Sequence, residues 1–166
     1  MLEQGTLVVY GIHGLCKIVK RDIMLVDRKY KEFFVLEPVK QPGASYYVPT
    51  QNPTAVAKLR PILTKKELDD LLSSQEVVSD SWITDENTRK QYYRDLINSG
   101  DRAALISMVK SIHLHKEQQQ TLGRKLHLCD ENFLRDAQNL LSTEFSVVLD
   151  IEPEAVGDYI KNAIMK

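Results

Sequence analysis

The 166-residue sequence has little of what marks several specialised classes of protein. Its two cysteines, Cys16 and Cys129, exclude a disulfide scaffold and suit a reducing cytoplasm, where we expect the protein to reside. No apolar run approaches the ~18 residues that a membrane span needs, so we expect no membrane partner. The N-terminus has no basic segment followed by an apolar one, and therefore carries no sign of a secretory signal.

Patterns that carry catalysis or bind a cofactor are also missing. The sequence has no Gly-rich phosphate loop and no nucleophile elbow. His113 and His115 are two positions apart in a predicted helix and do not share a face, so a zinc site would need ligands from distant segments. The acidic pairs Asp69-Asp70 and Asp130-Glu131 stand where helix caps and solvated turns explain them. We therefore expect no enzyme, no small-molecule substrate, no metal and no cofactor.

Charge is spread unevenly along a chain whose net charge is -1. Residues 1–63 hold nine Lys or Arg against five Asp or Glu, and residues 86–127 hold eight against four. Residues 64–85 hold two against six, and residues 128–166 hold three against eight. The total excludes a strongly basic DNA-coating protein. The two basic blocks are either ordinary solvated surface or surfaces that each face an anionic partner.

The first third of the chain has the pattern of short strands. Runs of β-branched and aromatic residues predict strands near residues 5–10, 15–20, 31–37, 45–48 and 57–60. Pro and Gly in residues 38–43 are typical of a turn. Five short strands without a helical period predict a small antiparallel barrel.

From Thr64 onward the apolar period is helical. Thr64 and Glu67 fit a capping box that opens a helix, and the polar residues 73–81 follow as a linker. Asp101 and Asp130 are predicted to cap two later helices, the first of which is broken by residues 118–123. Two further helices are predicted, one from about Glu86 to Asn98, ended by Gly100, and a last one from Pro153.

The predicted fold is therefore α+β and has two parts. Residues 1–63 form a five-stranded antiparallel barrel, and residues 64–82 form a connecting helix and a linker. Residues 83–166 form a compact all-helical domain, which brings the helices of the chain to about four or five.

Trp82 is the only tryptophan, and it precedes the predicted helix that starts near Glu86. This helix is predicted to turn Tyr93 inward and to place Arg89 and Lys90 elsewhere. In one interpretation, Trp82 staples the start of the helix to the core. In the other, it is an exposed aromatic beside cations that hold phosphates, so that the indole wedges against or between bases.

An ordered set of short segments runs through nearly the whole chain. In the first half it comprises residues 5–14, 32–37 and 47–49, Asn52 and residues 59–62. In the second half it comprises Trp82, Arg89, Leu96, residues 99–101, residues 108–110 and the pattern Leu126, Leu134, Ala137, Leu141, Glu144. This set resembles the CarD/CdnL family of bacterial transcription regulators. Their N-terminal module is shared with the RNA-polymerase-interacting domain of the transcription-repair coupling factor, which lacks the helical tail.

The resemblance implies a Tudor-like or SH3-like barrel that docks on the β subunit of bacterial RNA polymerase, partly by strand pairing. It also implies a helical domain that contacts promoter DNA near the upstream fork of the transcription bubble, without sequence-specific readout. The expected function is that of a transcription regulator that modulates the stability of the open promoter complex. The alternative is a protein-interaction adaptor that touches no DNA, in which Trp82 is a core residue.

The family's contact residues are carried over as expectations. Trp82 is the wedge, and the phosphate contacts are Arg89, Lys90, Lys110, Arg124 and Lys125. The polymerase contacts are Met24 and Arg28, placed on a loop, and Tyr46 and Tyr47. Neighbours on a strand point to opposite faces, so we expect one of the two tyrosines to pack inside the barrel.

Overall fold

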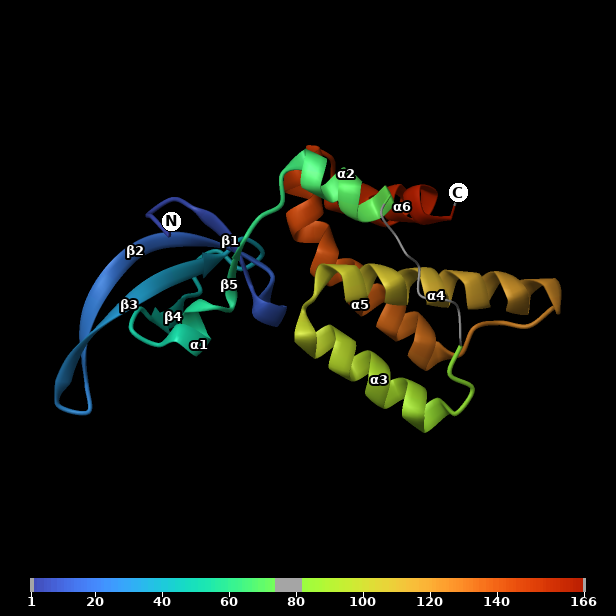
Figure 1. Ribbon diagram of the computed structural model, residues 1–166, viewed down its shortest axis with the longest axis horizontal. Coiled ribbons are helices and arrows are strands. Elements are labelled where there is room, and N and C mark those ends of the chain that lie inside the picture. The colour runs from blue at the N-terminus through green and yellow to red at the C-terminus, as the bar shows by residue number, and fades with distance from the viewer. Residues whose placement is uncertain (1, 74–81, 166) are drawn as a thin grey trace. The chain divides into compact units, whose positions relative to one another are not determined.

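The computed structural model describes residues 2–73 and 82–165. The chain divides between Ile62 and Leu63 into a β-rich N-terminal unit and a helical C-terminal unit (Figure 1). The predicted α+β class, with strands first and helices after them, is confirmed. The predicted linker, residues 73–81, lies outside the described residues apart from Ser73, which ends a helix.

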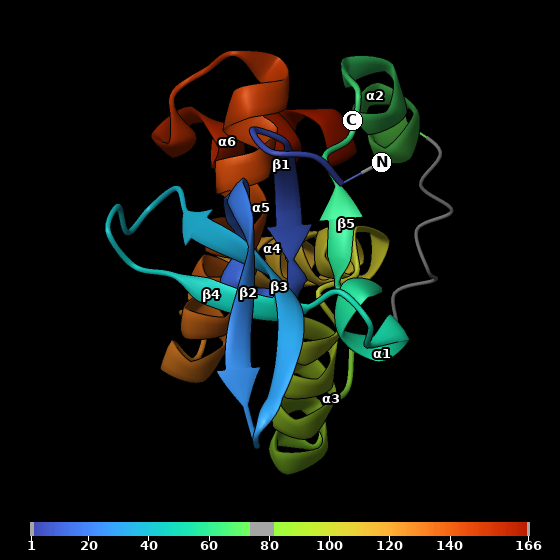
Figure 2. The ribbon, with the colours of Figure 1, turned by 90° about the vertical axis from the view of Figure 1, so that its left-hand side faces the viewer.

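The N-terminal unit is a five-stranded antiparallel sheet. Its strands are β1 (Leu7–Tyr10), β2 (Leu15–Val26), β3 (Lys29–Pro38), β4 (Tyr46–Pro49) and β5 (Leu59–Pro61). A 3-10 turn, η1 (Gly11–His13), follows β1, and the short helix α1 (Pro53–Val56) follows β4. The sheet order is β4-β3-β2-β1-β5, so β4 and β5 are the edge strands. The β2–β3 hairpin projects past the ends of the other strands (Figures 1 and 2).

The β2–β3 hairpin is longer than the sequence predicted. β2 continues to Val26 and meets β3 through a two-residue turn, Asp27-Arg28. Both turn residues have positive φ, 53° and 63°, as a type I′ turn requires. Such turns are usually marked by Gly or Asn, and the charged pair at this position carries no such signal. Met24 therefore lies within a strand, and the expectation that it lies on a loop was wrong.

The N-terminal unit has its own hydrophobic core, formed mainly by side chains of the sheet. The buried residues of this core are Val8, Cys16, Ile18, Phe34, Leu36, Val48 and Leu59. Burial raises the pKa of Cys16 to about 11, so its thiol stays protonated and packs as a small apolar side chain.

Five helices form the described part of the C-terminal unit. They are α2 (Lys65–Ser73), α3 (Glu86–Ser99), α4 (Arg102–Thr121), α5 (Leu128–Leu149) and α6 (Pro153–Ile164). The Thr64 hydroxyl accepts a hydrogen bond from Glu67 N at 3.1 Å, and Gly100 ends α3 with φ of 63°. All five helices contribute to one core, and α2 adds Leu68 and Leu72 to it, so α2 belongs to this unit. No described helix has the length and apolar character needed to cross a membrane.

The start of α5 differs from the prediction. The helix begins at Leu128 with His127 at its N-cap position, so Asp130 lies in the first turn and does not cap the helix. Asp130 is fully buried, because its carboxylate points inward and binds an arginine of α3. Helix α4 also continues to Thr121, past the break that was predicted from residue 118.

Candidate interaction sites

One face of the β2–β3 hairpin carries apolar side chains that continue onto β4. Paired residues of an antiparallel ladder project to the same face, and neighbours along a strand alternate between faces. One face therefore carries Met24 and Val26 together with the paired residues Asp22–Phe33, Phe33–Pro49 and Val35–Tyr47. We call this surface the Met24 face; its members are Met24, Val26, Phe33, Tyr47 and Pro49. Tyr47 is 49% exposed, and its ring meets that of Phe33 edge-on at 6.5 Å between centroids.

Tyr46 points to the opposite face from Tyr47. It packs against the core of the sheet, with its ring centroid 5.6 Å from that of Tyr10 and 4.6 Å from that of His13. Arg28 lies exposed at the tip of the hairpin. The surface available to a partner thus includes Tyr47 and Arg28. Tyr46 packs on the core instead, so it is not among the proposed polymerase contacts.

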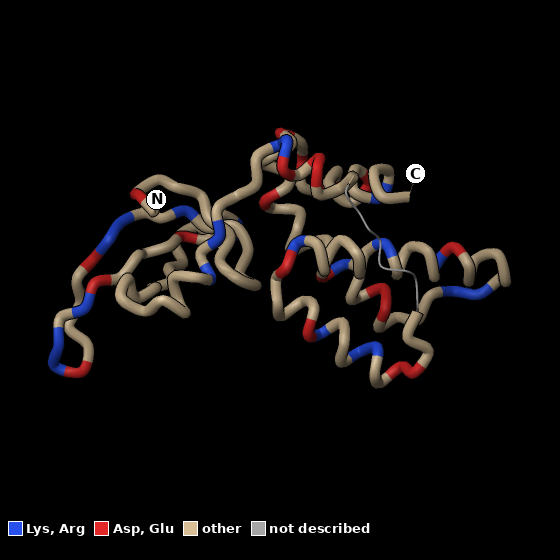
Figure 3. The backbone as a smooth tube through the Cα atoms, in the orientation of Figure 1, with Lys and Arg blue, Asp and Glu red and all other residues tan. Residues whose placement is uncertain are grey.

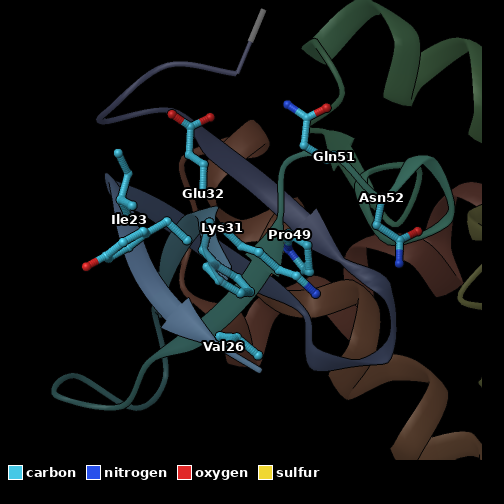
Figure 4. Close-up of a pocket in the computed structure, with 9 residues that line it drawn as sticks. Ile23, Val26, Lys31, Glu32, Pro49, Gln51 and Asn52 are labelled. Carbon is cyan, nitrogen blue, oxygen red and sulfur yellow. The ribbon is translucent and has the colours of Figure 1, made fainter. Parts of the chain in front are cut away.

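An apolar hollow of about 690 Å³ lies along the N-terminal half of β3 (Figure 4). It is lined by Ile23, Val26, Tyr30, Lys31, Glu32, Phe33, Pro49, Gln51 and Asn52. β4 pairs with β3 only from Phe33 to Leu36, and beyond it Thr50 N donates to Glu32 O at 3.1 Å. Within residues 2–73 and 82–165, no strand lies beside residues 29–31 on this edge of β3. An added strand and its apolar side chains fit such an edge and hollow.

In the helical unit, Trp82 is half-buried within a cluster of aromatic and charged side chains. Its indole stacks face to face on His115, with ring centroids 3.7 Å apart and planes 4° from parallel. The Arg89 Cζ atom lies 4.7 Å from the indole centroid, and Tyr93 meets the indole edge-on at 6.3 Å. The indole is therefore held by partners from two helices, α3 and α4.

Arg89 is the buried centre of this cluster and is only 3% exposed. Its Nε and Nη2 atoms donate to the two carboxylate oxygens of Asp130 at 2.9 Å each, and Nη1 donates to Ile83 O at 2.9 Å. Arg89 lies four residues before Tyr93, so both project from the inward face of α3. Arg89 was expected to point away from the core and to contact phosphate. Its burial corrects both expectations, because the guanidinium points inward and binds Asp130.

The N-terminal unit matches a known family. Residues 2–63 match the sequence model of the CarD-like/TRCF RID domain. The N-terminal unit is a CarD-like/TRCF RID domain. Domains of this family are Tudor-like, non-catalytic interaction modules that bind RNA polymerase. The Met24 face and the hollow both belong to this RID domain.

A second similarity is to a segment of an enzyme. The chain is 33% identical over 110 residues to the UDP-N-acetylmuramoylalanine–D-glutamate ligase of Streptococcus uberis. The match covers 64% of this chain and 20% of the ligase, so the chain spans about a fifth of the length of that enzyme. Among the described side chains, no group of three or more His, Cys, Asp or Glu could hold a metal ion. A match to a fifth of an enzyme identifies a shared segment rather than a catalytic activity.

Outside the RID domain, the other predicted phosphate contacts are partly or fully exposed. Lys90 is half-exposed on α3 and forms an ion pair with Glu86 at 3.4 Å. Arg124 and Lys125 are exposed in the loop between α4 and α5 (Figure 3). Lys110 is half-buried on α4, more than one turn before the residue that stacks on Trp82. Lys90 thus lies on the same helix as the buried Arg89, and the loop cations precede α5, which carries Asp130.

His115 should control how far Trp82 is exposed to solvent. Burial lowers the pKa of His115, so its ring is neutral at pH 7 and stacks without placing a second cation beside Arg89. We expect His115→Ala to increase acrylamide quenching of Trp82 fluorescence, and to lower the free energy of unfolding by about 1 kcal/mol. The exposed His127→Ala should leave both quantities unchanged. Equal quenching of His115→Ala and the unmodified protein would contradict the stack.

Proposed function

We propose that the protein docks on the β subunit of bacterial RNA polymerase through the Met24 face and the hollow of its RID domain. Its helical unit then contacts promoter DNA at the upstream edge of the transcription bubble and modulates the stability of the open promoter complex. The observation that carries this proposal is the match of residues 2–63 to an RNA polymerase-interacting family. It is supported by the exposed apolar surface on the same residues.

The chemistry of the RID surface suits a protein partner. Tyr47 offers exposed aromatic contact area, and aromatic residues are enriched at protein interfaces. The buried Phe33 ring packs edge-on against it. The open edge of β3 at residues 29–31 offers backbone groups to an added strand, and the hollow beside it accepts alternate side chains of that strand. Arg28 at the hairpin tip adds a cation to this surface.

The proposed DNA contact rests on Trp82 and on cations of the helical unit. The indole is fixed before DNA arrives, which reduces the entropy lost on contact. The proposed phosphate contacts are Lys90, Arg124, Lys125 and the half-buried Lys110. Since the polymerase would bring the helical unit close to promoter DNA, a few phosphate contacts suffice and no recognition helix is needed.

A second candidate function is an adaptor that binds polymerase and touches no DNA. The burial of Arg89 favours it, because the nearest cation to the indole is committed to Asp130. The packing of Trp82 against the helical core favours it as well. Both candidates share polymerase binding, so that step is tested first.

Polymerase binding is measured by titrating the fluorescently labelled protein into purified bacterial RNA polymerase. We expect saturable binding, and we expect Tyr47→Ser to raise Kd about tenfold, which equals 1.4 kcal/mol. Tyr92→Ser is the matched control, because Tyr92 on α3 is 48% exposed and lies outside the RID domain. No binding by the unmodified protein would overturn both candidate functions, and equal effects of the two variants would overturn the role of the Met24 face.

A further inference from the structure

The β2–β3 hairpin carries apolar side chains on both of its faces, beside Lys29 and Lys31 on the Met24 face and Glu32 on the other. Residues 23–26 are four successive apolar residues, so Met24 and Val26 project to the Met24 face while Ile23 and Leu25 project to the other. Leu25 pairs with Tyr30, which extends this second face onto β3. Ile23, Leu25 and Tyr30 are 65%, 61% and 78% exposed. We call these three residues the second face.

A strand with water on one side normally alternates apolar and polar residues. If the second face were polar, the hairpin would show this alternation, with its apolar residues on the Met24 face alone. Instead the second face presents three large apolar side chains, and none of the described residues covers them. Contiguous exposed apolar patches mark interaction sites on soluble proteins.

The two faces meet at the hollow beside the open edge of β3. Ile23 and Tyr30 line it from the second face, and Val26 and Phe33 line it from the Met24 face (Figure 4). A segment seated in the hollow along residues 29–31 would therefore contact both faces at once. The second face is thus continuous with the surface proposed above for polymerase.

Charge selects the kind of partner. Residues 20–32 contain five Lys or Arg and three Asp or Glu. The tip, residues 27–31, contains three Lys or Arg and one Asp. Figure 3 shows the charged residues along the hairpin. A second copy of this chain would bring these like charges together, which disfavours pairing of two hairpins. An apolar partner surface with acidic side chains around it complements the hairpin.

We propose that the hairpin is enclosed on both faces by the β subunit of RNA polymerase, at an apolar surface bordered by acidic side chains. Ile23, Leu25 and Tyr30 are then contact residues in addition to the Met24 face. This inference rests on the proposed docking of the RID domain on polymerase.

The test compares exposed apolar residues inside and outside the hairpin, in the full-length protein titrated into purified RNA polymerase. We expect Leu25→Ser and Tyr30→Ser each to raise Kd at least fivefold. Val39→Ser is the matched control, because Val39 is 46% exposed in the same RID domain but lies after β3. It should leave Kd unchanged, and circular dichroism should show that all three variants are folded.

The outcomes separate this inference from the proposed function. If Tyr47→Ser weakens binding while Leu25→Ser and Tyr30→Ser do not, the second face is not enclosed and the inference is overturned, whereas docking through the Met24 face stands. If the free protein sediments as a dimer that Leu25→Ser dissociates, with polymerase affinity unchanged, the second face binds another copy and the inference is likewise overturned. If the unmodified protein does not bind polymerase, the proposed function itself fails.

Discussion

Arg89→Ala should lower the free energy of unfolding of the helical unit by about 3–5 kcal/mol. The substitution leaves the Asp130 carboxylate fully buried without the two hydrogen bonds of 2.9 Å that compensate its charge. It also removes the guanidinium that lies 4.7 Å from the Trp82 ring and binds Ile83 O. Because whole domains are stable by about 5–15 kcal/mol, this loss is a large fraction of the total. Urea unfolding followed by circular dichroism and by Trp82 fluorescence measures it.

Two variants test the assignment of this loss to the ion pair. Arg94→Ala removes an exposed cation from the same helix and should change the free energy of unfolding by no more than about 0.5 kcal/mol. The double variant Arg89→Met/Asp130→Leu removes both charges and should recover much of the stability lost in Arg89→Ala, since no unpaired charge remains buried. A double variant as unstable as the single one would show that packing, rather than the unpaired carboxylate, dominates the loss.

Trp82→Ala should shorten the lifetime of open promoter complexes about five- to thirtyfold, if the indole contributes about 1–2 kcal/mol at the upstream fork. The expected cause is the loss of an aromatic wedge that slows closure of the bubble. Polymerase affinity should stay unchanged, because the proposed polymerase contact lies on the RID domain and Trp82 lies outside it. The lifetime is measured by competitor challenge of preformed complexes, with the protein at saturating concentration.

Two controls make the lifetime measurement decisive. Tyr92→Ser changes an exposed aromatic of α3 and should leave the lifetime unchanged. Circular dichroism must show that Trp82→Ala keeps its helices, because Trp82 also packs on the helical core. A lifetime unaffected by Trp82→Ala, with the folded variant demonstrably bound, would refute the wedge and leave the adaptor function.

Features encoded by neighbouring residues could be predicted from the sequence. The hydroxyl of Thr64 and the carboxylate of Asp101 each accept a backbone hydrogen bond three residues on, as their positions before apolar helices predicted. Gly100 ends α3 with positive φ, a conformation that favours glycine. These features depend on local geometry, so a single sequence is sufficient to reveal them.

The centre of the helical unit could not be predicted in this way. Arg89 and Asp130 are 41 positions apart, and each has a plausible local role, as a surface cation and as a helix cap. Only the packing of α3 against α5 shows that they neutralise each other. The hollow of the RID domain was missed for a related reason. The apolar run 23–26 was visible, but the turn at Asp27-Arg28 that turns it into a projecting hairpin had no glycine or asparagine to mark it.

The open edge of β3 should also limit the concentration that the unbound protein can reach before it aggregates. An edge flanked by apolar side chains on both faces is a template for strand pairing with any unfolded chain, and hence a starting point for aggregation. Lys29 and Lys31 on this edge oppose such pairing by charge, an effect that salt weakens. Molecules bound to a partner have this edge covered and are protected from aggregation. Overproduction would therefore lead to aggregation of the unbound molecules.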